Sequence, residues 1–419
     1  MRIFADLHIH SRYSRATSSK MNVRDLEYYA REKALNLLGT GDFTHPLHLR
    51  ELKENLRDDG TGVMKSDGMN YILQTEISLV YKQDGALRKI HNVILAPHFE
   101  VVDQINNWLD TKGRRDYDGR PTFGFTCPEL VEVMMSISKD IMVIPAHAWT
   151  PWFSLYGSNS GFDSIKDCFK DQLKNIYAIE TGLSSDPPMN WRLSELDDFA
   201  LVSNSDSHSP WPWRLGRECN VFNLKELTYR NLVDAIKKKD PKRFEMTIEV
   251  DPAYGKYHYD GHRACGIVLS PKEAIKLNNI CPVCGRPLTI GVEHRVEELA
   301  DREEGFVPKD AIPFRRLLPL SELIAGVMKI GNPYSKKVME EYSKLIKRFG
   351  NEFEILLNVP EEELMKVTDE KIVRYIIKNR NQEIEVKPGY DGVYGVPIIN
   401  SNEMDLKRKT GQKSLFHFK

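Results

Sequence analysis

The stretch RIFADLHIH, from Arg2 to His10, decides the fold of this chain. Its first part, Arg2 to Leu7, is apolar and bounded in the way that predicts a short β-strand. Residues i and i+2 of an extended strand point to the same side, so His8 and His10 would project together from the end of this strand. One His-x-His pair is weak support for a metal site, because a lone histidine is more often a hydrogen-bonded core or surface residue.

Ligand-type residues recur after other short apolar runs. Ile141–Pro145 and Ala200–Ser203 predict strands that lead into further histidines and carboxylates. In barrels of parallel strands and helices, the C-terminal ends of the strands carry the active site, so these side chains would meet there. The candidate metal ligands are His8, His10, Asp42, His45, Glu76, His91, His147, Asp206 and His208, and the members expected to carry catalysis are His8, His10, Glu76, Asp206 and His208.

The rhythm of the chain predicts an α/β fold. Short apolar runs alternate with helical patterns at Val23–Lys33 and Cys127–Ser138, and Leu37–Thr40 predicts a further strand. The charged insertion Asp110–Gly124 is expected to be a loop that touches substrate or is simply solvated. A length of 419 residues suits two or three domains. We expect a catalytic domain at 1–225, a zinc-binding domain at 226–334, a helical domain at 335–400 and a tail at 401–419.

Composition excludes some classes of protein. The 59 basic and 60 acidic residues give a formal charge of -1, so the chain is no polycation and any nucleic-acid surface must be local. No stretch approaches the roughly 18 apolar residues of a membrane span. The first ligand strand follows the initial Met at once, without a signal-peptide pattern. We therefore expect a cytoplasmic protein without membrane association.

Three cysteines cluster with histidines in the second half of the chain. Cys281 and Cys284 form a Cys-x-x-Cys knuckle, and His262 and Cys265 form a second pair. In a reducing compartment such a cluster indicates metal rather than disulfide. Four ligands close a tetrahedral site, so we expect one structural Zn²⁺ that contributes to folding. His258 or His294 could take the place of His262.

The C-terminal third contains helical patterns and a distinct end. Helices are expected at Ser335–Phe349, Glu361–Lys366 and Thr368–Lys378. The last residues read QKSLFHFK, with Gln412, Leu415 and Phe418 at the spacing of peptides that dock on the DNA sliding clamp. Lys419 stands where a second aromatic residue is usual. Alternatively, these aromatic side chains pack against their own domain.

The ordered series of ligands resembles the polymerase and histidinol phosphatase (PHP) domain family over residues 1 to about 225. This resemblance implies a distorted barrel of about seven strand–helix units. It also implies two or three bound divalent ions and hydrolysis of phosphate esters. Of Zn²⁺, Mn²⁺ and Mg²⁺, mixed histidine and carboxylate ligands suit the first two better than Mg²⁺ alone. The family commonly has a histidine directly after the aspartate of its second motif. Here Phe43 follows Asp42, so His45 is taken as the substitute.

The arrangement of the whole chain narrows the resemblance. The segment Tyr257–Cys265, the Cys281 knuckle, the phrase Glu293–Arg302 and the clamp-like tail are together similar to the endonuclease Q family. This implies a DNA repair endonuclease that cuts 5′ of deaminated bases (uracil, hypoxanthine, xanthine) and of abasic sites. The implied partners are damaged DNA, double- or single-stranded, and the sliding clamp PCNA.

A damaged base would have to leave the helical stack to be read. Aromatic and hydrogen-bonding residues follow the ligand motifs and could contact such a base: Trp149, Trp152, Glu180, Asp186, Trp211 and Trp213. Tryptophans in barrel loops also pack in the core, and Glu180 could instead be an auxiliary ligand. Arg12, Arg15 and Lys20 could bind phosphate or be solvated. The competing functions are a phosphatase of small esters and a non-catalytic DNA adaptor.

Overall fold

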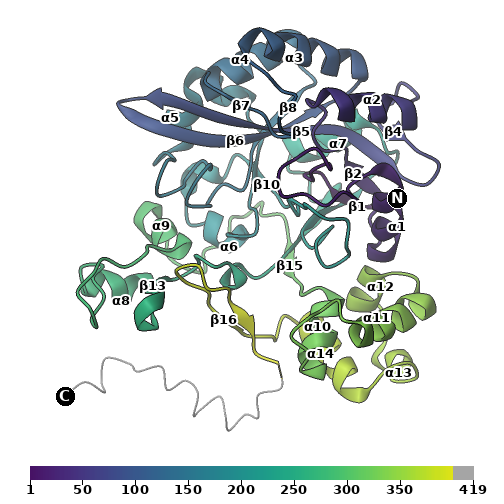
Figure 1. The fold of residues 1–419 in the computed structure, drawn as a ribbon, viewed down its shortest axis with the longest axis vertical. Helices are drawn as coiled ribbons and strands as arrows, with labels where there is room; N and C mark the ends of the chain where they lie inside the picture. The colour runs from purple at the N-terminus through teal and green to yellow at the C-terminus, as the bar shows by residue number, and fades with distance from the viewer. Residues whose placement is uncertain (400–419) are drawn as a thin grey trace.

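The computed structural model describes residues 1–399, which form three regions (Figure 1). An α/β barrel occupies the upper part of the view. A small segment with α8, α9 and β13 and a helical bundle with α10–α14 lie below it on opposite sides. The expected class, a distorted PHP-type barrel followed by a metal-binding segment and a helical region, is confirmed.

The barrel is built on a mixed sheet. β1, β2 and β5 are parallel, whereas β5 and β6 form a long antiparallel hairpin and β6 pairs antiparallel with β8. β9 and β10 form a separate parallel pair. The strands are β1 (Arg2–Asp6), β2 (Leu37–Gly39), β3 (Arg57–Asp58), β4 (Met64–Lys65), β5 (Asn70–Gln83), β6 (Ala86–Ala96), β7 (Thr122–Phe123), β8 (Met142–Pro145), β9 (Ala178–Glu180) and β10 (Ala200–Val202).

Helices cover the sheet, and their ends follow from the sequence. α1 (Val23–Lys33) begins at Asn22, whose side chain accepts from the Asp25 backbone N–H, and ends at Ala34 in the left-handed region. α4 (Cys127–Ile137) is capped by Thr126 in the same way. The remaining helices of the barrel are α2 (Pro46–Asn55), α3 (Phe99–Lys112), α5 (Ile165–Phe169), α6 (Pro187–Asn190) and α7 (Tyr229–Lys237).

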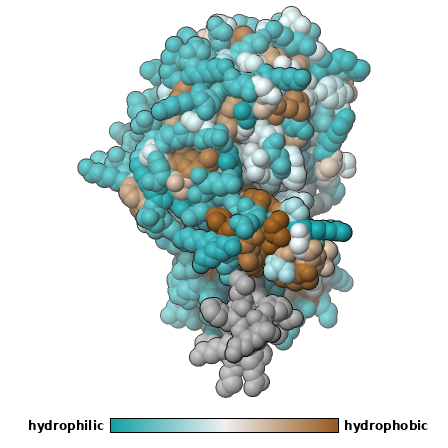
Figure 2. Space-filling view, turned by 90° about the vertical axis from the view of Figure 1, so that its left-hand side faces the viewer, coloured by the Kyte–Doolittle hydropathy of each residue, from teal (hydrophilic) through white to brown (hydrophobic). Residues whose placement is uncertain are grey.

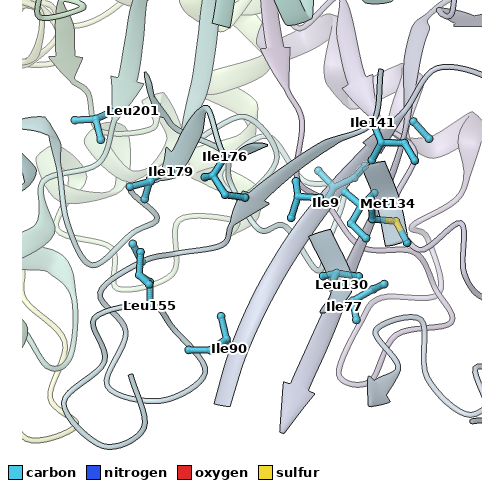
Figure 3. Packing of buried hydrophobic residues seen from close by; sticks show 14 of the residues in the cluster. Ile9, Ile77, Ile90, Leu130, Met134, Ile141, Leu155, Ile176, Ile179 and Leu201 are labelled. Atoms are coloured by element: carbon cyan, nitrogen blue, oxygen red, sulfur yellow. The ribbon is translucent and has the colours of Figure 1, made fainter. Parts of the chain in front are cut away.

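The apolar core holds these layers together. One cluster contains Leu130 and Met134 of α4 with Ile77 and Ile90 of the long hairpin (Figure 3). A second cluster contains alternate residues of β1, such as Ile3 and Ala5, with residues of α7. Each cluster buries many aliphatic side chains, and burial of one such side chain contributes about 1.5–3 kcal/mol. The strands that carry the ligand motifs are therefore anchored on both faces.

The barrel extends past the expected boundary at residue 225. β11 (Cys219–Asn223) pairs antiparallel with β1, and β12 (Phe244–Glu249) pairs with β11. β15 (Phe314–Arg316) then adds to β12 as a parallel strand. The chain thus leaves the sheet for the metal-binding segment and returns to it, which composition alone does not reveal.

The metal-binding segment has a very small core of its own. It contains β13 (Asp260–His262), β14 (Ile267–Leu269), α8 (Pro271–Lys276) and α9 (Val292–Leu299). Ala274, Cys281 and Leu288 are the buried residues of its cluster, while Ile275 and Val283 are exposed. Figure 2 faces the side that carries this segment and shows hydrophobic side chains gathered in the lower half of the molecule. The segment therefore buries little apolar surface in a core of its own.

The helical region starts earlier than expected, at Leu320 rather than 335. Its elements are α10 (Leu320–Met328), α11 (Lys336–Phe349), α12 (Glu352–Leu357), α13 (Glu361–Leu364), α14 (Glu370–Arg380), and the hairpin strands β16 (Val386–Lys387) and β17 (Val396–Pro397). A buried ion pair ties this region to the barrel, because Lys33 Nζ of α1 lies 2.7 Å from Glu352 Oε1. In the described residues, no helix is long and apolar enough to cross a bilayer.

Candidate metal centre

Four side chains from distant parts of the chain converge at the end of β1. His8 and His10 are fully buried. Ile9 between them forms a parallel bridge with Ser207, which brings Asp206 beside the two rings. His10 Nε2 lies 3.0 Å from Asp206 Oδ1 and 3.2 Å from Glu76 Oε2, and His8 Nε2 lies 3.6 Å from the same Glu76 oxygen. His8, His10, Glu76 and Asp206 therefore form one candidate ion site.

A second candidate site shares Glu76 with the first. Its other carboxylate oxygen, Oε1, lies 2.7 Å from His91 Nδ1 and 3.1 Å from His147 Nε2. Glu76, His91 and His147 are all buried. Glu76 and His91 lie in the middle of β5 and β6, not at strand ends as the other ligands do. One carboxylate thus faces two sites and is placed to bridge two ions.

The donor set fits divalent cations. Nε2 of His8 and of His10 and Oδ1 of Asp206 are buried, and although they lie close together none of them makes a well-directed hydrogen bond in the described part of the chain. Buried polar atoms without partners are costly, and a cation would satisfy all three. Burial raises the pKa of Glu76, but the neighbouring His91 and Arg120 outweigh it and lower the pKa well below its usual range. Mixed imidazole and carboxylate ligands suit Zn²⁺ or Mn²⁺.

Two carboxylates orient the rings from behind. Glu180, at the end of β9, has both oxygens 3.0 Å from His8 Nδ1, and Asp42 Oδ1 lies 3.0 Å from His10 Nδ1. Each pair leaves Nε2 of the ring free to bind an ion. Asp42 and Glu180 therefore lie behind candidate ligands and outside both clusters, Asp42 in place of the ligand role expected for it and the buried Glu180 away from the solvent-exposed surface.

Two expected histidine ligands lie outside both clusters. His45 stacks on Tyr13, with ring centroids 4.5 Å apart, and its Nε2 lies 3.2 Å from the Asp116 carbonyl oxygen. This position corrects the expectation that His45 replaces the missing histidine of the second motif. His208 has its ring 4.4 Å from that of His10 and is partly exposed, so it borders the mouth of the site without entering either cluster.

Three residues of the centre have strained backbones. Asp42, His147 and Asp206 have φ values of 42°, 30° and 47°. Non-glycine residues in this left-handed region cost free energy, on the order of 1–3 kcal/mol each. Each of the three residues follows the end of a strand. The left-handed backbone there turns the chain so that ligand side chains can gather at this end of the barrel.

The aromatic candidates separate into exposed and packed residues. Trp149 is buried, stacks on Tyr156 and donates from Nε1 to Asn190. Trp213 is buried and stacks on Tyr334, with ring centroids 4.7 Å apart. These two tryptophans are packed in the protein interior.

The other two candidate tryptophans, which solvent reaches at least in part, lie on two different loops. Trp152 is 46% exposed and lies on the loop that follows His147. Trp211 is half-buried and stacks on Trp213, with ring centroids 5.8 Å apart. Asp186, in contrast, is buried, caps α6 and pairs with Arg316 of β15, which corrects its assignment to substrate binding.

One charged residue of the site, Arg120, is not marked by any motif of the sequence. Arg120 lies in the insertion expected to be a charged loop, and its Nη1 donates to Glu76 Oε2 over 2.9 Å. The cluster of arginines and glycines in that loop was a signal, but nothing in the sequence showed which arginine reaches the ligands.

The expected zinc ligands also come together. His262, Cys265, Cys281 and Cys284 have their ligand atoms within 4.8 Å of one another. The two alternative histidines lie elsewhere: His294 Nδ1 is 2.6 Å from Asp260 Oδ2, and His258 stacks on Tyr259. Four protein ligands leave no open position, so this cluster fits a structural Zn²⁺.

Comparison with curated proteins gives two relatives. The chain is 28% identical over 413 residues to the uncharacterized protein YqxK of Bacillus subtilis, covering 94% of this chain and 98% of YqxK. It is 37% identical over 268 residues to the uncharacterized protein MJ0043 of Methanocaldococcus jannaschii, covering 63% of this chain and about a third (33%) of MJ0043. Residues 319–383 match the family model of the MJ0043 C-terminal domain, in agreement with the helical region that begins at Leu320.

Comparison with solved structures covers nearly the whole chain. The crystal structure of the lesion-specific endonuclease PfuEndoQ from Pyrococcus furiosus superposes with a TM-score of 0.86 and 33% identity, over 97% of this chain and 99% of that one. A complex of endonuclease Q with a 27-mer duplex that has an abasic lesion at the active site gives a TM-score of 0.84 and 33% identity, over 97% and 100%. The chain belongs to the endonuclease Q family of metal-dependent nucleases.

Proposed function

We propose that this protein is a DNA repair endonuclease that hydrolyses the phosphodiester bond 5′ of deaminated bases and abasic sites. The observation that carries the proposal is the shared carboxylate of Glu76, which faces two clusters of buried imidazoles at one end of the barrel. Adjacent cation sites of this kind suit phosphodiester hydrolysis. The likeness to an endonuclease Q that holds an abasic duplex supports DNA as the substrate.

The chain's own residues prepare the site for this reaction. The proposed ligands are His8, His10, Glu76, His91, His147 and Asp206. Divalent ions bound there would acidify a water and offset charge on the leaving oxygen. Glu180 and Asp42 hold the His8 and His10 rings so that each Nε2 is left for a metal ion. We also propose that two or three ions bind there and that they are Zn²⁺, Mn²⁺ or Mg²⁺.

The exposed Trp152 and the half-buried Trp211 are proposed to contact the DNA. The backbone carbonyl of Trp152 accepts from Thr150 Oγ1, and Thr150 Oγ1 lies 3.2 Å from His147 Nδ1, so this loop is continuous with the centre. Trp211 lies under Lys20 Nζ, 5.4 Å from its ring centroid. An aromatic face next to a cation suits an unstacked base.

Recruitment through a sliding clamp remains a proposal from sequence. Gln412, Leu415 and Phe418 lie outside the described residues. We expect deletion of 412–419 to abolish capture of the purified chain by immobilised PCNA while nicking continues, and Ser414→Ala to leave capture unchanged. Equal capture of the deleted and full chains would refute the motif.

Nicking of defined duplexes tests the catalytic proposal. End-labelled duplexes with one uracil, hypoxanthine, xanthine or abasic site are incubated with Mn²⁺, and the cut position is read on a sequencing gel. One cut 5′ of the lesion supports the proposal. Phosphate release from small esters without any cut would instead support the phosphatase, and tight duplex binding without either reaction would support the adaptor.

A further inference from the structure

Arg120 approaches the metal centre on a firmly held loop. Residues 113–121 connect α3 to β7, and hydrogen bonds fix this loop close to Arg120. Gly119 donates its N–H to the Tyr13 carbonyl over 3.0 Å, and the Gly119 carbonyl accepts from Thr44 Oγ1 over 3.1 Å. On the other side, the Pro121 carbonyl accepts from the Ser78 N–H of β5 over 3.1 Å. The backbone on both sides of Arg120 is therefore fixed to the barrel.

The loop also passes very close to the residue that orients His10. A Cβ added to Gly119 would lie 2.3 Å from Asp42 Oδ2 and 2.4 Å from Ser14 Oγ. Glycine is needed here because any side chain would displace the loop or the carboxylate. This close approach sets how far the Arg120 side chain reaches over the mouth.

The guanidinium of Arg120 lies between the ligands and solvent. Its Nη1 donates to Glu76 Oε2 over 2.9 Å, and its side chain is 30% exposed while that of Glu76 is 0% exposed. A guanidinium carries five N–H donors in a planar fork. The contact with Glu76 uses one of them, so others remain for a group that arrives from solvent.

The charges around Arg120 indicate which kind of substrate group its remaining donors would bind. Ions bound by Glu76 would compete with Arg120 for this carboxylate, and two cations and a guanidinium so close together would repel one another. An anion between them removes the repulsion. Guanidinium matches phosphate with two parallel hydrogen bonds, a geometry that lysine cannot provide.

Other cations near the mouth are less suited to this role. Arg12 is paired with Glu51, and Arg15 is 78% exposed and lies 3.3 Å from Asp118 Oδ2. Lys20 lies over Trp211. In the described residues, none of these three forms an ion pair with a proposed metal ligand.

We propose that Arg120 is a catalytic residue that binds the non-bridging oxygens of the scissile phosphate and stabilises the charge that develops on them. This inference rests on the proposed endonuclease activity and adds the group that holds the reacting phosphate. In this role the Arg120 guanidinium would leave the Glu76 carboxylate, with which it pairs in this structure, and bind the substrate phosphate.

The test compares Arg120→Gln and Arg120→Lys with Arg114→Gln. Arg114 lies on the same loop but is 77% exposed and pairs with Asp116. Removal of one such electrostatic donor costs about 10²–10³-fold in kcat. We expect this loss in Arg120→Gln, a smaller loss in Arg120→Lys and none in Arg114→Gln. Mn²⁺ affinity by calorimetry should not fall in any of the three, and should rise in Arg120→Gln because a competing cation is removed from Glu76.

Binding without cleavage supplies a second readout. The Mn²⁺-loaded protein is titrated with an uncleavable lesion duplex over a range of salt concentrations. At the cut position of this duplex a phosphonate replaces the bridging oxygen by CH₂ and keeps both non-bridging oxygens. Loss of one phosphate contact lowers the salt dependence by about one unit of slope. We expect this for Arg120→Gln and not for Arg114→Gln.

The outcomes distinguish this inference from the activity on which it rests. If the unmodified protein cuts no lesion duplex, the endonuclease proposal fails and this one fails with it. If it cuts and Arg120→Gln cuts equally well, only the role of Arg120 is refuted. If Arg120→Gln weakens Mn²⁺ binding and excess Mn²⁺ restores kcat, Arg120 only positions Glu76, which also refutes the inference.

Discussion

Replacement of Glu180 by Gln tests how the fold prepares the metal centre. The carboxylate is fully buried and accepts from three groups. These are His8 Nδ1 at 3.0 Å from either oxygen, the His147 backbone N–H at 2.9 Å from Oε2 and Asn204 Nδ2 at 2.8 Å from Oε1. Glutamine keeps the shape of the side chain but removes its charge.

The expected losses of stability and of metal affinity in Glu180→Gln follow from these contacts. Both oxygens face donors, so the amide NH₂ of Gln meets a donor in either orientation and one hydrogen bond is lost. A buried donor left without a partner costs about 1–3 kcal/mol of stability. Loss of the carboxylate behind a metal-binding histidine typically lowers metal affinity about 10–100-fold. This corresponds to about 1.4–2.8 kcal/mol.

Calorimetric titration with Mn²⁺ measures the effect, and Glu195→Gln is the matched control. Glu195 accepts from Tyr156 Oη at 2.8 Å, Ser164 Oγ at 2.6 Å and the Ile165 N–H at 3.3 Å, so the same substitution disturbs a comparable network that contains no proposed ligand. We expect weaker Mn²⁺ binding in Glu180→Gln alone. Equal affinity in the two variants would refute the argument that Glu180 orients His8.

Three further predictions concern protons and zinc. Burial raises the pKa of Glu249 from 4.5 to about 7, so the protonated carboxyl stabilises the fold at low pH and this stability is lost as pH rises through about 7. Between pH 5 and pH 8, the free energy of unfolding of Glu249→Gln should therefore rise relative to that of the unmodified protein by up to about 3 kcal/mol. A difference in Tm that does not depend on pH would contradict this. Burial lowers the pKa of His8 and His10 but neighbouring carboxylates outweigh it and raise both, so Mn²⁺ binding should weaken as pH falls and release protons, measured by calorimetry in buffers of different ionisation enthalpy. Cys281→Ser should lose the bound zinc while Cys219→Ser keeps it, measured by elemental analysis; equal zinc in both would remove the proposed site.

Local patterns predicted the elements well where a cap or an apolar run marks them. Val23–Lys33 is found as α1 with the expected bounds, and the strand expected at Ile141–Pro145 is found as Met142–Pro145. The helix expected at Thr368–Lys378 begins instead at Glu370, because the side chain of Asp369 accepts from the Lys371 N–H and caps it.

The site was predicted by residue type more reliably than by role. His8, His10 and Asp206 lie where the sequence pattern placed them because strand ends converge. Asp42 was expected as a ligand, yet its left-handed backbone turns the carboxylate toward the far side of the His10 ring. Arg120 could not be found because its contact with Glu76 spans 44 residues of chain and depends on the tertiary course of a loop.

Cutting of an abasic duplex by the purified chain tests the central claim most directly. An end-labelled duplex with one abasic site is incubated with Mn²⁺ and the unmodified protein, Asp206→Ala, or the control Asp67→Ala, whose side chain is exposed. We predict one cut 5′ of the lesion with the unmodified protein and the control, and none with Asp206→Ala. Intact duplex with the unmodified protein, or equal cutting by Asp206→Ala, would contradict the account.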